Sequence, residues 1–298
     1  EEEFKLSAIK FGTDGWRAVI SEDFTFENVK RVAQTIADYT NNHKFENRSG
    51  IVVGYDTRFL SDKYAELVSC VMAANGIKTV LTDRPTPTPS ISYAIKDRKF
   101  TGGVVITASH NPARYNGIKY KAYYAGSAGP EITKELEGYL DREVKSMPFD
   151  EAKKSGNLKT ENIIPRHLAF VKKYVDINKL RKAHLKVLVD SMYGTGNDYI
   201  AMLLKGPRCK VDTIHGEINP GFGGINPEPI LPNLKELADR TKREGYDIGI
   251  ATDGDADRLG IASPDGKLLT GHKVMALLLL HLLEDRKIRG DVVQTICG

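Results

Sequence analysis

GGVVITASHNPARYNGIK, residues 102–119, decides the fold and the place of the chemistry. After two glycines, the apolar run 104–106 predicts a short buried strand. Small and polar residues then replace the apolar ones, and Pro112 disfavours helical geometry at Asn111. The chain is therefore expected to leave the sheet in a loop and to return as a hairpin strand over 118–124.

Three chemically versatile side chains follow this strand: Ser109, His110 and, ten residues after the serine, Lys119. In open α/β sheets, ligands bind beyond the carboxyl ends of the strands. An isolated serine at such a place more often only caps a turn, and an isolated lysine is more often a surface residue. The histidine and lysine beside it, and the aspartates described below, favour Ser109 as the chemical centre.

Short apolar runs alternate with segments of helical periodicity along the chain. Strands separated by helices imply a largely parallel sheet, so we predict an α/β protein with tandem α/β/α domains and mixed, largely parallel sheets. Two segments rich in proline, 84–90 and 215–232, are expected to be loops. The expected strands are 51–55, 77–81, 104–106, 118–124, 187–190, 210–214 and 246–252, and the expected helices are 26–41, 61–75, 131–144, 163–175 and 232–244.

The length of 298 residues suggests about two domains. The polar segment 145–161 has no periodicity and is interpreted as a linker. The segment 271–285 is predicted to be a helix that is apolar on every face, and such a helix needs covering layers. With a strand expected at 291–296, this last part is interpreted as the incomplete start of a further domain. The expected divisions are 1–150, 151–266 and 267–298.

The 43 basic and 39 acidic residues give a net charge of +4, and the two signs are interspersed. The sequence has no block of basic residues of the kind that would indicate nucleic acid or a membrane surface as a partner. The three cysteines lie far apart, which favours a reduced, cytoplasmic setting over a zinc site or a disulfide framework. The acidic N-terminus does not resemble a secretory signal, and the longest apolar run, 274–283, is about half a membrane span.

The motif DGDADR places Asp253, Asp255 and Asp257 at alternate positions directly after a predicted buried strand. Three carboxylates turned toward one point repel one another and need a counter-charge, which a hard cation such as Mg²⁺ supplies. A solvated acidic turn is the alternative. An EF-hand is excluded, because Arg258 stands where that motif requires glycine.

The surroundings of Ser109 do not match the GxSxG elbow of a serine hydrolase. A serine that carries a phosphoryl group fits better, since phosphoserine is a strong Mg²⁺ ligand and a good donor once its charge is neutralised. A lysine could exchange a proton with an incoming hydroxyl if nearby cations depress its pKa. An arginine offers a planar fork for phosphate oxygens.

Together, TASHNPARYNGIK, DGDADR and the early FGTDGWRA resemble the α-D-phosphohexomutase superfamily over nearly the whole chain. The resemblance implies four domains around a deep cleft, hexose phosphate and hexose bisphosphate as partners, and Mg²⁺ as cofactor. By motif it assigns the phosphoserine to Ser109, the metal ligands to Ser109, Asp253, Asp255 and Asp257, contact with the transferred phosphate to Arg258, acid–base and phosphate-stabilising roles to Lys119 and Arg17, and support of the serine to His110.

Outside the motif, Arg17 could be a surface ion-pair partner, Trp16 is expected to pack in the core, and the glycines of 194–196 are expected to form a tight turn. The favoured function is a phosphohexomutase, an isomerase of carbohydrate metabolism, with phosphoglucomutase first and phosphomannomutase or phosphoglucosamine mutase as close competitors. A non-catalytic sugar-phosphate-binding protein and an aspartate-dependent phosphatase remain alternatives. The family's sugar-gripping and distal phosphate-binding loops are expected beyond residue 298, so the chain alone is expected to be inactive.

Overall fold

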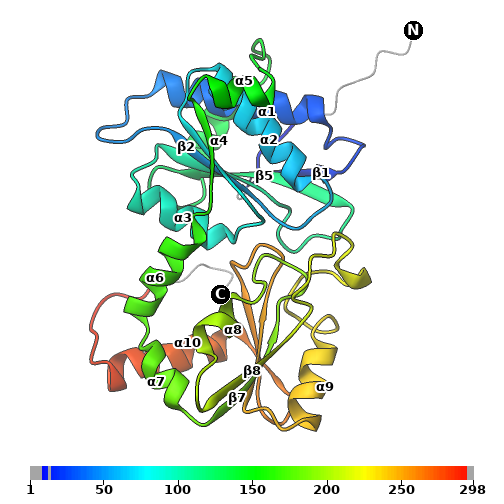
Figure 1. Ribbon diagram of the computed structural model, residues 1–298, viewed down its shortest axis with the longest axis vertical. Coiled ribbons are helices and arrows are strands. Elements are labelled where there is room, and N and C mark those ends of the chain that lie inside the picture. The colour runs from blue at the N-terminus through cyan, green and yellow to red at the C-terminus, as the bar shows by residue number, and fades with distance from the viewer. Residues whose placement is uncertain (1–8, 13–14, 294–298) are drawn as a thin grey trace.

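The computed structural model describes residues 9–12 and 15–293 and places them around two sheets, one above the other in Figure 1. A six-stranded sheet has the order β1-β5-β4-β2-β3-β6, and a five-stranded sheet has the order β11-β10-β9-β7-β8. Both sheets mix parallel and antiparallel pairs and carry helices on both faces. The predicted α/β class with tandem α/β/α domains is confirmed.

The first sheet is parallel at its centre and antiparallel on one side. β2 pairs in parallel with β3 and β4. β5 runs antiparallel to β4 and to β1, so the predicted hairpin return is confirmed. The elements are β1 Trp16–Val19, α1 Phe26–Asn42, β2 Ile51–Tyr55, α2 Ser61–Ala74, β3 Thr79–Thr82, α3 Thr88–Asp97, β4 Gly102–Ile106, β5 Tyr115–Ala122, α4 Pro130–Glu137, α5 Phe149–Lys154 and β6 Leu158–Glu161.

Successive side chains of the central strand β2 enter two different cores, as the pleat of a strand requires. Val53 belongs to the cluster of α1 and α2, with Val32 and Ile36, and none of the three is exposed. Val52 lies in the opposite cluster, with Ile91 of α3. Burial of each such side chain stabilises the fold by about 1.5–3 kcal/mol. The two cores therefore fix the carboxyl ends of β2 and β4, where the site forms.

The interpretation of 145–161 as a linker is wrong. It contains α5 and then β6, which pairs in parallel with β3 from Leu158 to Glu161. Ala152 and Leu158 are buried in the first core. β6 is a four-residue edge strand whose first residue alone is fully buried, so it leaves almost no apolar periodicity in the sequence. The first sheet therefore extends beyond the expected boundary at residue 150.

Three other predicted element ends are also wrong. The loop expected over 84–90 stops early, because α3 begins at Thr88 and accommodates the next proline in its first turn. The helix expected to run to residue 144 ends with Gly138 as its C-cap. α9 begins at Lys235 and not at Pro232.

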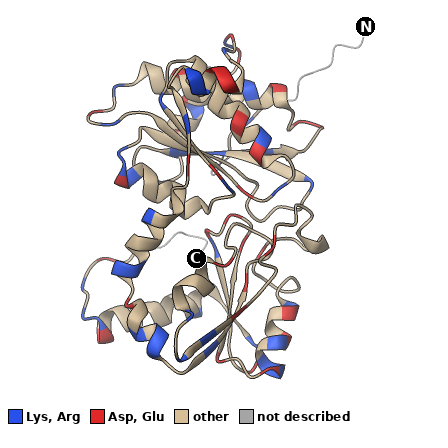
Figure 2. Cartoon of the chain, viewed as in Figure 1, with Lys and Arg blue, Asp and Glu red and all other residues tan. Residues whose placement is uncertain are grey.

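The second sheet is built on β7, which pairs in parallel with β8 and β9. β10 runs antiparallel to β9 and also to β11, which follows it after a turn at Asp265 and Gly266. In Figure 2, the positions of basic and acidic residues are interspersed along the helices of both units. The elements are α6 Ile164–Tyr174, α7 Ile177–Lys182, β7 Leu185–Asp190, α8 Tyr199–Leu204, β8 Cys209–Ile214, α9 Lys235–Arg243, β9 Ile248–Thr252, β10 Leu259–Ala262 and β11 Leu268–Leu269.

The last described segment carries α10, Gly271–Leu280, followed by a wider helical turn at His281–Asp285. The predicted apolar helix is thus present, and Leu277, Leu278 and Leu280 are more than half exposed. The strand expected over 291–296 is absent from residues 291–293, and its remainder lies outside the described residues. Within 9–12 and 15–293, none of the helices is both long enough and apolar enough to cross a bilayer.

Candidate active site

The candidate site lies where the carboxyl ends of β4 and β9 meet. β4 leads into the serine loop, residues 107–111, and β9 leads into the aspartate loop, residues 253–258. Ser109 Oγ lies 3.0 Å from Asp253 Oδ2, although 144 residues separate the two in sequence. The site therefore requires both sheets, and each contributes one half of it.

Ser109 is held in a constrained conformation. It has no exposed surface, and its φ of 54° lies in the left-handed region. This region costs a residue with a side chain about 1–3 kcal/mol and persists only where the surroundings impose it. The Ser109 amide donates to Thr107 Oγ1 at 2.9 Å. The hydroxyl oxygen of Ser109 lies 3.4 Å from His110 Nδ1.

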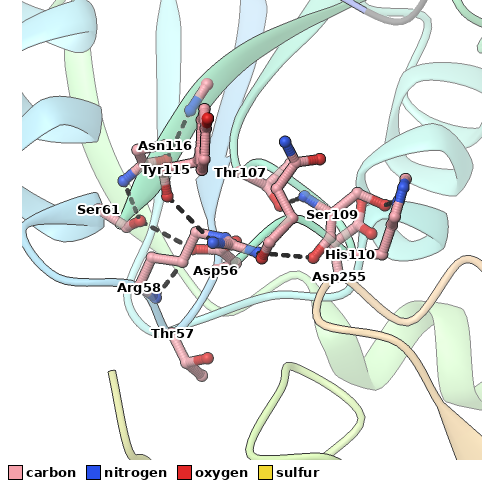
Figure 3. A network of polar contacts seen from close by, with 12 residues as sticks. Asp56, Thr57, Arg58, Ser61, Thr107, Ser109, His110, Tyr115, Asn116 and Asp255 are labelled. Carbon is pink, nitrogen blue, oxygen red and sulfur yellow. Dashed lines mark hydrogen bonds and ion pairs between the residues drawn. The ribbon is translucent and has the colours of Figure 1, made fainter. Parts of the chain in front are cut away.

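The strongest constraint on the serine loop is Arg58, at the end of β2 (Figure 3). Its Nε donates to Asp56 Oδ2 at 3.0 Å, and neither side chain is exposed. The remaining guanidinium N–H groups donate at 2.7–3.0 Å to backbone carbonyls, so all five donors of the fork are used. The four acceptors are the carbonyl oxygens of Ser109, Asn111, Pro112 and Tyr115.

Asp56 completes this buried network. It accepts from the Arg58 amide at 2.9 Å and from Ser61 Oγ at 2.8 Å. Burial raises the pKa of Asp56 and lowers that of Arg58, so each charge depends on the other. Leu60 occupies the N-cap of α2 with a φ of 60°, so the hydroxyl of Ser61, the first residue of the helix, is left to donate to Asp56. Sequence reasoning noted the strand end before Asp56 and gave it no role.

The aspartate loop also folds around one of its own carboxylates. Asp253 Oδ1 accepts the amides of Asp257 and Arg258 at 2.9 and 3.0 Å, which leaves Oδ2 to face Ser109. Asp255 Oδ2 accepts from Lys119 Nζ at 2.8 Å, and Lys119 also lies 3.2 Å from Asp257 Oδ2. One oxygen from each of the three aspartates lies within 4.8 Å of the others.

These carboxylates fit a hard divalent cation. Asp255 Oδ1 is buried and has no hydrogen-bond partner among the described residues. Burial, with the charges of Asp255 and Asp257, raises the pKa of Asp253 to about 8. Burial also opposes ionisation of Asp255, but Lys119 outweighs it and holds the pKa of Asp255 at about 2. A cation bound to the three carboxylates, with Ser109 Oγ beside them, would relieve both the repulsion and the unpartnered oxygen.

The basic residues singled out from the sequence gather at the same place. Arg17, on β1, donates from Nη1 to Asn111 Oδ1 at 2.8 Å. Arg258 donates from Nη1 to His110 Nδ1, also at 2.8 Å. Burial and the Arg258 charge lower the pKa of His110, so its neutral ring accepts this hydrogen bond at neutral pH. Arg258 keeps 46% of its side chain exposed, at the open side of the site.

The burial of Lys119, of the aspartates and of Trp16 decides between the structural and functional roles considered for them. Lys119 is only 1% exposed and is not a surface lysine. Asp253 and Asp255 have no exposed surface, whereas Asp257 is exposed, so the aspartate loop is not a wholly solvated turn. Trp16 packs in the core and stacks on Phe24 with ring centroids 5.0 Å apart, as predicted.

The fold is shared with known proteins. Residues 8–147 match the family description "Phosphoglucomutase/phosphomannomutase, alpha/beta/alpha domain I", and residues 165–266 match domain II of the same family. The phosphoglucosamine/phosphogalactosamine mutase of Sulfurisphaera tokodaii is 34% identical over 273 residues, covering 90% of this chain and 58% of that protein. The phosphoglucomutase/phosphomannomutase of Thermococcus kodakarensis is 33% identical over 270 residues, again covering 90% and 58%.

A crystal structure from Thermus thermophilus, provisionally described as a phosphomannomutase, matches with a TM-score of 0.85 at 33% identity. The match covers 94% of this chain and 62% of that one. The chain therefore belongs to the phosphoglucomutase/phosphomannomutase family of the α-D-phosphohexomutase superfamily. It spans 58% to 62% of the length of these relatives.

Proposed function

We propose that this chain is the phosphoserine- and metal-bearing part of a phosphohexomutase, which interconverts hexose 1-phosphate and hexose 6-phosphate through a bisphosphate. The observation that carries the proposal is the approach of Ser109 Oγ to within 3.0 Å of Asp253, within a cluster of three aspartates and a buried lysine. This arrangement suits a phosphoryl group on the serine, because its charge would lie beside a cation site and away from bulk water.

In the proposed reaction, the bond between phosphorus and Ser109 Oγ breaks as a bond forms to a hydroxyl oxygen of the sugar phosphate. A bound Mg²⁺ would supply charge neutralisation and alignment of the phosphate oxygens. Lys119 donates to Asp255 and Asp257, so it must lose its own proton before it can act as a base, and a cation bound to these carboxylates would favour that loss. The neutral amine is proposed to take the hydroxyl proton and to return it when the second phosphate goes back to the serine. Arg258, at the open side, is proposed to contact the transferred phosphate, since an arginine fork matches phosphate oxygens.

The other two basic residues are proposed to support this chemistry. The neutral His110 ring accepts from Arg258 and lies beside Ser109, so it would orient both without carrying charge. Arg17 holds the Asn111 side chain at the rim of the serine loop and would stabilise phosphate there.

Glucose phosphate is the first proposed substrate, with mannose phosphate and glucosamine phosphate as alternatives. The named relatives support the hexose phosphate class, and they include both phosphoglucosamine mutases and phosphoglucomutase/phosphomannomutases. We also propose a cytoplasmic setting, because Cys70 and Cys209 are buried free thiols and thiols stay reduced in that compartment. Because the relatives are longer, we propose that residues 1–298 alone turn over hexose phosphate slowly or not at all.

The test follows phosphoryl transfer from the phosphorylated chain to glucose, mannose and glucosamine monophosphates, each with Mg²⁺. We expect bisphosphate to form from at least one of them, and from none with Ser109→Ala. Hydrolysis of a simple phosphate ester that survives Ser109→Ala would favour the aspartate-dependent phosphatase instead. A chain that never acquires a phosphoryl group on Ser109 would favour the non-catalytic binding protein.

A further inference from the structure

Thr88, the first residue of α3, makes a two-point contact with the aspartate loop. Its Oγ1 donates to Asp255 Oδ2 at 2.6 Å, and its amide donates to the Asp255 carbonyl at 2.9 Å. The two residues are 167 positions apart in sequence, and they come from the units built on different sheets. Thr88 is 2% exposed, so water does not compete for these hydrogen bonds. The short distance is typical of a hydroxyl that donates to an ionised carboxylate.

The contact decides which oxygen of Asp255 remains for a cation. Oδ2 already accepts from Thr88 Oγ1 and Lys119 Nζ, and both donors come from the first sheet's unit. The other oxygen, Oδ1, is buried without a hydrogen-bond partner among the residues described. A carboxylate with one oxygen held by two donors cannot exchange its oxygens freely. Oδ1 is therefore the ligand atom left to face the other aspartates.

The position of Thr88 is itself rigid. It stands between Pro87 and Pro89, whose rings restrict the backbone on both sides. Two residues further on, the buried Ser90 Oγ lies 2.8 Å from His167 Nδ1 on α6. The start of α3 is thus fixed to the segment that leads into the second sheet, and through Thr88 to the aspartate loop.

We propose that Thr88 is a positioning residue for the metal site: it holds Asp255 so that Oδ1 faces the cation, and it completes the site only when the two units are docked. The inference rests on the proposed function for the presence of the cation. A group that hydrogen-bonds to the second oxygen or nitrogen of a metal ligand holds that ligand in place. Removal of such a group commonly weakens metal binding by about 10- to 100-fold.

The test is a titration of the dephosphorylated 298-residue chain with Mn²⁺, in which electron paramagnetic resonance measures the concentration of free ion and so gives the affinity of the site. Thr88→Val keeps the shape and removes the hydroxyl, and should weaken Mn²⁺ binding by about 10- to 100-fold. Thr88→Ser restores the hydroxyl and should bind as the unmodified chain does. Thr101→Val is the matched control, since that buried hydroxyl donates to the Gly50 carbonyl at 2.8 Å.

Each outcome is decisive. Equal affinity of Thr88→Val and the unmodified chain would overturn the positioning role alone. Thr88→Ser binding as weakly as Thr88→Val would also overturn it, because the loss would then come from packing and not from the hydroxyl. Absence of Mn²⁺ binding by the unmodified chain would instead overturn the metal site, and the proposed function with it. Thermal unfolding in a chelator checks that each variant is folded.

Discussion

Replacing Arg58 by methionine is expected to lower the free energy of unfolding by about 3–5 kcal/mol, the usual cost of removing one partner from a buried ion pair. Methionine fills a similar space but has no donors. It leaves the Asp56 carboxylate buried and unpaired, and it leaves four backbone carbonyls in and just after the serine loop without their donor. These include the Ser109 carbonyl, so the loop that carries the proposed phosphoserine should loosen along with the fold.

Thermal unfolding followed by circular dichroism measures the effect. At about 2–4 °C per kcal/mol for a domain of this size, the expected loss corresponds to a fall of about 6–20 °C in Tm. Arg84→Met is the matched control. That arginine is 52% exposed and pairs with Asp83 at the surface, so its removal should cost less than about 1 kcal/mol.

A second variant separates the charge from the packing. Combining Arg58→Met with Asp56→Asn removes the unpaired carboxylate, and should recover part of the lost stability. A loss of less than about 1 kcal/mol for Arg58→Met would contradict the reasoning, because it would match a surface pair. A double variant no more stable than Arg58→Met alone would show that the buried charge is not the cause.

Three further perturbations test other parts of the site. Gly254→Ala would place a Cβ 2.5 Å from the Ser109 carbonyl, so it should force the two loops apart and reduce phosphoryl transfer; unchanged transfer would contradict the close approach. Asp255→Asn should abolish tight Mn²⁺ binding. In the unmodified chain, a chelator should halt phosphoryl transfer while the phosphoserine remains intact. Transfer that continues in excess chelator would contradict the requirement for a metal. The hydrogen bond and charge of Asp190 raise the pKa of His215 above its ordinary 6.5. The stabilising effect of this pair is therefore complete below pH 6.5 and is lost as the pH rises through the raised pKa. The stability of the unmodified chain should fall relative to His215→Gln above pH 6.5. Denaturant midpoints of the two chains that keep a constant difference across pH would show that the pair is unimportant.

The central strands and both functional loops could be predicted from the sequence because their signals are local. An apolar run that stops at polar residues marks the strand end before Ser109 and again before Asp253. Short edge strands carry weaker signals. β1 and β6 have four residues each, too few to show a clear periodicity, and three of the four residues of β6 are not buried, so both were missed.

Arg58 and Thr88 were also missed, for a different physical reason. Their partners lie 51 to 57 residues away for Arg58 and 167 residues away for Thr88. Nothing in the local sequence pattern distinguishes an arginine that donates hydrogen bonds to four backbone carbonyls from an arginine at the surface. The DTR that follows β2 and the TPTP that runs into α3 are the only local signs, and both resemble ordinary loop sequences.

The most direct test of the central claim is the mass of the Ser109-containing peptide before and after treatment with phosphate donor and acceptor. After incubation with glucose 1,6-bisphosphate and Mg²⁺, the peptide should gain the mass of one phosphoryl group, with fragmentation placing it on Ser109. An excess of the matching hexose monophosphate should then remove that mass and yield bisphosphate. A peptide that never gains the group, or a group found on another residue, would contradict Ser109 as the phosphoryl carrier.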